Sequence, residues 1–167
     1  MANYDIFCLM EYFSNRADVP ATGRSPVGQW QNFFQEPQTL GSQQESSGQY
    51  QFLAFDAEGF GSSEGSAIND VQVTMAATAE MMIVTENAMD QDNLIIIMLF
   101  TQSVGQDSIV EGTFTEISRY IGTLNSATAT DETISWTINP AVNKMDPQVP
   151  PKKISADMLN QMRQRLK

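Results

Sequence analysis

The sequence predicts a mainly β domain of six to eight strands, with one flanking helix and a further helix at the C-terminus. Two observations support this fold class. Charged residues make up only 17% of the 167 residues, and Ser, Thr, Gln, Asn and Gly take their place. That composition favours hydrogen-bonded sheets and polar loops over a helical bundle. Apolar and polar residues also alternate in several short segments, at the two-residue period of a strand.

The expected strands are short and separated by turn residues. The apolar, aromatic stretch Tyr4–Phe13 is a first strand, although a short helix is an alternative there. Residues 94–100 (LIIIMLF) are apolar throughout, as in a central strand covered on both faces, with the helix over one of them. The other expected strands are residues 49–56, residues 71–75, a strand or bulged pair within 109–121 with Gly112 as its irregularity, and residues 134–138, which Pro140 ends.

Residues 76–89 predict the one internal helix. They are rich in Ala and Met, and Ala79, Met82 and Ile83 recur at helical spacing.

Residues 14–48 contain few strand signals. Pro20, Gly23, Pro26 and Gly28 indicate a loop over residues 14–28. Trp30, Phe33 and Phe34 form a compact aromatic group that we expect to pack on the core. Residues 35–48, with Leu40 as their sole apolar residue, are either a loose surface loop or an arm that orders only against a partner.

Charge divides the chain into two parts. Residues 25–143 carry fifteen acids and one base, Arg119, whereas residues 144–167 carry six bases and two acids; the whole chain has a net charge of −11. We therefore expect an acidic β-rich domain over residues 1–143, and a proline-containing linker followed by a basic amphipathic helix over residues 144–167. So acidic a body argues against sequence-specific DNA binding, which requires concentrated positive charge.

The C-terminal helix is the predicted docking element. Ser155 can cap it, and its apolar residues fall on one face while Arg163, Arg165 and Lys167 load its end with positive charge. Docking on the chain's own body and docking on a partner both stay open. Membrane binding is disfavoured because the apolar face has no aromatic anchor, and the longest apolar run has seven residues. The residues predicted to make the contact are Met158, Leu159, Met162, Arg163, Arg165 and Leu166.

Residue types exclude most catalytic chemistry. The chain has no histidine and a single cysteine, Cys8, which we expect to be buried. The acids around the glycine-rich turn do not match a calcium loop, since Phe60 and Ala67 occupy ligand positions. We expect no metal, no cofactor, no small-molecule substrate and no enzymatic activity; a two-carboxylate hydrolase is a minor hypothesis. The acids in question are Asp56, Glu58, Glu64 and Asp70.

Three segments together resemble a family of small phage minor tail proteins, similar to those of lambda-like phages. They are residues 49–55 (QYQFLAF), residues 68–73 (INDVQV) after a glycine-rich turn, and the alternation of residues 134–138 leading into a proline-rich exit. The resemblance spans residues 49–151. It departs from the pattern in that one cysteine cannot supply the iron–sulfur domain of the lambda-like relatives. Residues 35–48 and the basic terminal helix also have no counterpart.

The resemblance implies a β-sandwich or split barrel with a flanking helix. It further implies a virion structural protein of the tail hub or baseplate, made in the bacterial host cytoplasm, that assembles into a ring joining the tail tube to the distal tail tip. Its partners would be copies of itself and neighbouring tail tube, hub and baseplate proteins, with DNA only as passing cargo. The alternative is a soluble carbohydrate-binding β-sandwich, in which Trp30, Trp136 and Tyr50 would stack on sugar rings from an exposed surface.

Overall fold

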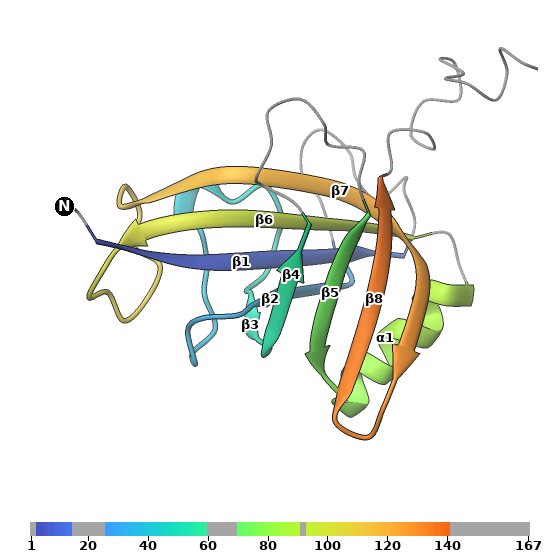
Figure 1. The fold of residues 1–167 in the computed structure, drawn as a ribbon. Helices are drawn as coiled ribbons and strands as arrows, with labels where there is room; N and C mark the ends of the chain where they lie inside the picture. Colours follow the sequence, from blue (N-terminus) through green and yellow to red (C-terminus); the bar gives the residue numbers. More distant parts are fainter. Residues whose placement is uncertain (1–2, 15–25, 60–69, 91–92, 141–167) are drawn as a thin grey trace, which may run out of the picture.

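The computed structural model describes residues 3–14, 26–59, 70–90 and 93–140, which form one eight-stranded mixed sheet curled into a half-barrel with one α-helix (Figure 1). The mainly β class with a single flanking helix is thus confirmed, and the described strands belong to one sheet, not to the two of a sandwich. The strands lie in the order β3-β2-β1-β6-β7-β8-β5-β4, and every pairing is antiparallel except that of β2 with β3. The elements are β1 Tyr4–Phe13, β2 Gly28–Gln31, the 3-10 turn Gly41–Gln43, β3 Gln51–Phe52, β4 Phe55–Glu58, β5 Val71–Ala76, α1 Ala79–Asp90, β6 Leu94–Ser103, β7 Phe114–Ala129 and β8 Thr133–Pro140.

The two outermost strands of the sheet, β3 and β4, are consecutive in the chain. The prediction of a single strand over residues 49–56 is therefore wrong, because β3 and β4 are separated by Leu53 and Ala54. The Leu53 amide donates to the Gln31 carbonyl (2.9 Å) on one side, and the Ala54 carbonyl accepts from the Ala76 amide (3.0 Å) on the other. The curling of the sheet brings its two edges together here, so the chain changes partner between β2 and β5. We call residues 53–54 the seam.

Asn32 braces the seam with its side chain. Its Oδ1 accepts a hydrogen bond from the Cys8 amide (2.8 Å), and its Nδ2 donates to the Phe55 carbonyl (3.0 Å). One short side chain thereby connects β1 to β4, which are separated by four strands in the sheet order and lie on opposite sides of the seam.

The inner core fills the inside of the curl. It collects side chains from β1, β2, β4, β5, β6, β7, β8 and α1, among them the fully buried Trp136. The predicted helix is confirmed, but the residues that indicated it point the other way: α1 buries Met81, Val84 and Ala88, whereas Met82 and Ile83 are exposed. Thr85 fastens α1 to β8, because the Trp136 indole Nε1 donates to its Oγ1 (2.9 Å).

The outer core lies on the opposite face of β1, β6 and β7. Phe7, Phe100 and Phe114 form a ladder of aromatic contacts there, with ring centroids of neighbours 5.6 to 5.7 Å apart. Because cores lie on both sides of β6, the prediction of a central strand covered on both faces is confirmed. The predicted aromatic group is split, since Phe34 belongs to the outer core, Trp30 to the inner core, and Phe33 is 42% exposed.

Strand β7 is much longer than predicted. It begins at Phe114, after a turn in which Gly112 adopts φ +84°, and continues to Ala129 with a register shift between Leu124 and Ser126. Gly122 permits close packing within it, because an added Cβ would lie 2.5 Å from the Asn139 carbonyl oxygen of β8. The short final strand predicted around Trp136 is confirmed as β8.

Candidate functional site

The most polar part of the sequence, residues 35–48, packs on the chain's own sheet. The structure does not show the loose loop or the partner-dependent arm that were expected. The Leu40 side chain is buried in the outer core, and Gln38 forms a bridge with Tyr50 through both backbone groups. The Gln38 side-chain oxygen also accepts a hydrogen bond from the Ile109 amide (2.8 Å). We call residues 35–48 the polar segment; it covers the outer core.

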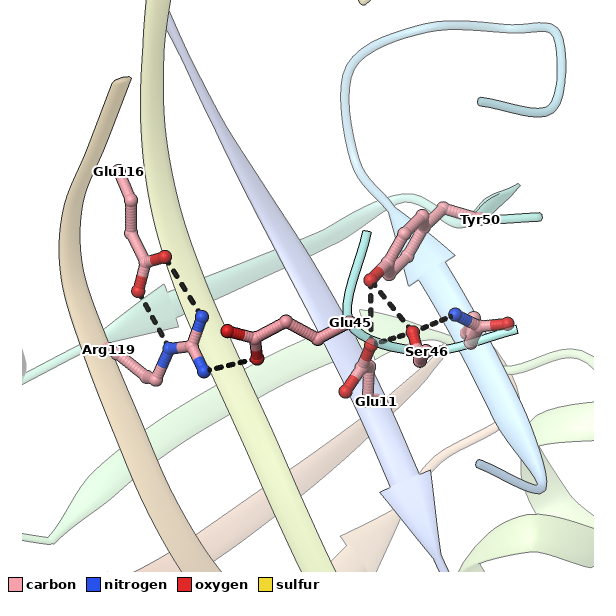
Figure 2. A network of polar contacts seen from close by, with 7 residues as sticks. Glu11, Glu45, Ser46, Tyr50, Glu116 and Arg119 are labelled. Atoms are coloured by element: carbon pink, nitrogen blue, oxygen red, sulfur yellow. Dashed lines mark hydrogen bonds and ion pairs between the residues drawn. The ribbon is translucent and has the colours of Figure 1, made fainter. Parts of the chain in front are cut away.

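A buried network fastens the end of the polar segment to β1 and β2 (Figure 2). Glu11, on β1, is fully buried, and its Oε1 accepts hydrogen bonds from Tyr50 Oη (2.6 Å) and from Ser46 Oγ. Gln29 Nε2, on β2, donates to Ser46 Oγ (2.7 Å). Burial, together with the neighbouring Glu11 carboxylate, raises the pKa of Tyr50 well above its ordinary value, so the phenol keeps its proton and remains a donor.

A second cluster ties the polar segment to β7 at the surface. Arg119 Nη1 lies 2.8 Å from a Glu45 oxygen, and its Nε and Nη2 donate to the two oxygens of Glu116 at 2.7 and 2.9 Å (Figure 2). The hydrogen bonds to Glu116 are the main reason that the pKa of Arg119 is raised, against the opposing effect of burial. Ser42 Oγ donates to Glu111 nearby. Arg119, the lone base of residues 25–143, is thus bound by two carboxylates of its own chain.

A small cavity of about 200 Å³ lies beside this cluster. Its lining includes Leu40, Glu45, Tyr50, Phe100, Glu116 and Arg119. A two-carboxylate hydrolase needs its acids on either side of an empty site that can hold the scissile bond. Here both carboxylates face the guanidinium between them and not one another (Figure 2). The arrangement can hold two segments together, and it offers no acid–base pair.

The cysteine and the acids of the glycine-rich turn are the other candidate functional residues from the sequence. Cys8 is buried as predicted, and burial raises the pKa of its thiol to about 11, so it stays protonated near neutral pH. Asp56 and Glu58 lie on β4, and Glu64 is outside the described residues. Among the residues that the structure describes, no group of three or more Cys, Asp or Glu could hold a metal ion.

The aromatic residues of the carbohydrate-binding alternative lie in the two cores. Trp30, Trp136 and Tyr50 are exposed by only 2%, 0% and 1%. None of the three rings can stack on a sugar, so that alternative loses the residues on which it depended.

The structure adds a surface that the sequence did not predict. The outward side of α1 exposes Met82 (40%), Ile83 (59%) and Met89 (48%) in one continuous helix, together with the exposed acids Glu86 and Asp90. We call these five residues the outer face of α1. Apolar side chains gathered on one helix face are typical of a contact surface.

The predicted docking residues Met158, Leu159, Met162, Arg163, Arg165 and Leu166 lie outside the described residues, as does the predicted linker. Within the described ranges, no helix is both long and apolar enough to cross a membrane. No protein-family model matches the chain, and a search of curated proteins finds no match either.

Proposed function

We propose that this chain is a non-enzymatic structural subunit of a phage virion, which assembles into a ring in the tail hub or baseplate and joins the tail tube to the distal tail tip. Copies of itself and the adjacent tail tube, hub and baseplate proteins are its partners, and DNA is only passing cargo. The chain is made in the bacterial host cytoplasm and ends in the virion.

The observation that carries this proposal is the form of the sheet. An eight-stranded sheet curled into a half-barrel, with one helix and a strand interrupted at its seam, fits the split barrel with a flanking helix that the family resemblance implies. The described parts of the segments that carry the resemblance include β3, the start of β4, the first half of β5 and most of β8. Strands β3 and β4 meet at the seam, and β5 and β8 follow β4 in the sheet order.

The distribution of charge supports the same role. In the described residues, all acids except the buried Glu11 and the half-buried Asp5 are exposed, and the single base, Arg119, is held by Glu45 and Glu116. An acidic surface repels the phosphates of DNA, so DNA passes along it without binding. The charged groups beside the 200 Å³ cavity hold the polar segment in place, which is a structural role.

Sedimentation of the purified full chain, alone and with the tail tube protein of the same phage, tests the proposal. We expect a ring-sized species or a complex with the tube, and rings in negative-stain images. An unrelated acidic β-domain of similar size serves as the control for non-specific association. A chain that stays monomeric at all concentrations and never joins a tail particle would overturn the proposal.

A further inference from the structure

We propose that residues 155–167 of the same chain dock on the outer face of α1. This inference concerns contacts within one chain. It is independent of ring assembly, and either can fail without the other.

The outer face of α1 and the sequence of residues 155–167 both carry apolar residues at helical spacing. Met82, Ile83 and Met89 of α1 are 40–59% exposed, although the rest of the helix's large apolar residues, Met81 and Val84, are buried. The C-terminal segment carries its apolar residues at a spacing that places them on one side of a helix, and its two Met side chains can adapt to an uneven surface. Packing the two faces removes both from water. The residues of that side are Met158, Leu159, Met162 and Leu166.

The charge of residues 155–167 complements that of the outer face of α1. Glu86 and Asp90 are exposed on the outer face of α1, and the last turn of the helix carries no basic residue. An acid at a helix C-terminus is unfavourable because the helix dipole is negative there, so a basic partner is favoured at this end. Arg119, the sole base in the described ranges, is already bound by Glu45 and Glu116. The segment that ends the chain carries three bases: Arg163, Arg165 and Lys167.

The path of the chain makes the contact reachable. Pro140, the last described residue, pairs with Gly122 of β7. Two residues further along β7, the Leu124 amide donates to Asn93 Oδ1 (2.8 Å), and Asn93 Nδ2 donates to the carbonyl of Ala88 in the last turn of α1 (2.6 Å). The chain therefore leaves the body near the C-terminal end of α1.

The length of the connecting segment allows docking along the whole helix. Residues 141–154 can extend to roughly 45 Å at about 3.3 Å per residue, whereas α1 is only about 18 Å long. A segment tethered this closely meets its own helix at an effective concentration on the order of millimolar, well above that of other copies in dilute solution. This is why the occupant is the same chain.

Disulfide trapping in the full-length chain tests the inference. Met162→Cys is combined in turn with Met82→Cys, Ile83→Cys and Met89→Cys, and the dilute protein is oxidised. We expect at least one pair to form an intramolecular disulfide, seen as a monomer of increased mobility on a non-reducing gel. Mass spectrometry of the joined peptides identifies the pair and separates it from any product of the buried Cys8.

The matched control is Met162→Cys with Ile117→Cys, since Ile117 is 50% exposed and lies on β7. We expect at least tenfold less of the intramolecular product from this pair. Equal trapping of both pairs, or no trapping from α1, would overturn the inference. Joined dimers without the intramolecular product would overturn it too, and would assign the segment to another copy.

Charge reversal provides a second readout. Glu86→Lys with Asp90→Lys should reduce the trapping of residue 162 to α1 several-fold, because the arriving arginines then meet like charge. Glu58→Lys with Asp107→Lys makes the same change of net charge at exposed positions away from α1 and should leave the yield unchanged. A yield that is insensitive to the first pair of substitutions contradicts the proposed orientation on the acidic face.

Discussion

Tyr50 Oη lies 2.6 Å from Glu11 Oε1, and this buried hydrogen bond joins residues that are 39 positions apart in the sequence. It connects Tyr50, two residues after the polar segment, to Glu11 near the C-terminal end of β1, on the face that the segment covers. Both residues are fully buried, so the bond is shielded from water.

Replacing Tyr50 with Phe should destabilise the fold by roughly 2 kcal/mol. The change removes one donor to a buried carboxylate while keeping the ring in the outer core. Urea unfolding followed by circular dichroism measures the loss. Tyr4→Phe is the matched control, because Tyr4 is 59% exposed, and it should change the free energy of unfolding by less than about 0.5 kcal/mol. Equal stability of the Tyr50 variant and the wild type would contradict a role for this bond.

Thr85→Val should destabilise the contact between α1 and β8. It leaves the indole N–H of the fully buried Trp136 without the Thr85 Oγ1 acceptor at 2.9 Å, at a cost of about 1–3 kcal/mol. Chemical denaturation gives the free energy, and tryptophan emission reports the altered indole environment. The exposed Thr128→Val on β7 makes the same chemical change and should be nearly neutral. If both variants are equally stable, the hydrogen bond contributes nothing measurable.

The polar segment should be coupled to β7 through Arg119. Its pairs with Glu45 and Glu116 are partly exposed, and such pairs contribute little, so Arg119→Gln should cost no more than about 1 kcal/mol. Limited proteolysis should nevertheless cut more quickly within residues 35–48. A double-mutant cycle with Glu45→Gln isolates the pair, with an expected coupling of about 0.5 kcal/mol. Strict additivity of the two substitutions would show that the ion pair contributes no coupling free energy.

Stability should fall in alkaline solution, beginning near pH 9. The folded state raises the pKa of Cys8 from 9.0 to about 11, and that of Tyr120 from 10.0 to about 12, chiefly by burial. The unfolded chain therefore loses these protons first, and rising pH favours unfolding over the windows pH 9–11 and 10–12. The contribution is intact below pH 9. For Cys8 it amounts to at most about 3 kcal/mol.

Cys8→Ala separates this thiol from the other titrating groups. Its free energy of unfolding should be lower than that of the wild type near pH 8 because of lost packing, but it should decline less steeply between pH 9 and 11. The comparison of slopes is the decisive measurement. Parallel pH profiles for the two proteins would show that Cys8 does not titrate differently on unfolding.

Deleting residues 152–167 should leave the half-barrel folded, since the eight described strands pair with one another and the described residues bury two hydrophobic cores among themselves. Near-ultraviolet circular dichroism should be unchanged, whereas binding of a hydrophobic dye should increase as Met82, Ile83 and Met89 lose their cover. Adding Ile83→Glu to the truncated chain should reverse part of that increase. A truncated chain that fails to fold would show that the C-terminal residues belong to the core.

Local sequence patterns predicted those strands and the helix in which residues at a regular spacing have the same surroundings. The alternation of Val71, Val73 and Met75 gave β5 because each second residue meets the inner core. The unbroken apolar run of β6 indicated cover on both faces for the same reason. The helix was also visible, but its orientation was not, since apolar residues at positions 81–84 occupy both of its sides and only Met81 and Val84 are buried.

What the sequence could not show depends on contacts between distant segments. Residues 49–56 look like one strand locally, and only the curling of the sheet divides them at Leu53 and Ala54. The second half of β7 consists of small and polar residues without a regular pattern, so its own sequence does not predict a strand. Its pairing with β8 determines its extended conformation. The polar segment is ordered by Glu11 and Arg119, which no local signal connects to it.

The seam also bears on how copies of this chain can meet. A sheet edge presents unpaired backbone groups, and long edges invite strand-by-strand polymerisation of the kind that produces amyloid. Here the sheet ends in β3, of two residues, and β4, of four, with the charged Asp56 and Glu58 on the latter. Copies crowded together are thereby protected from joining backbone to backbone, and their association must be specified by side chains.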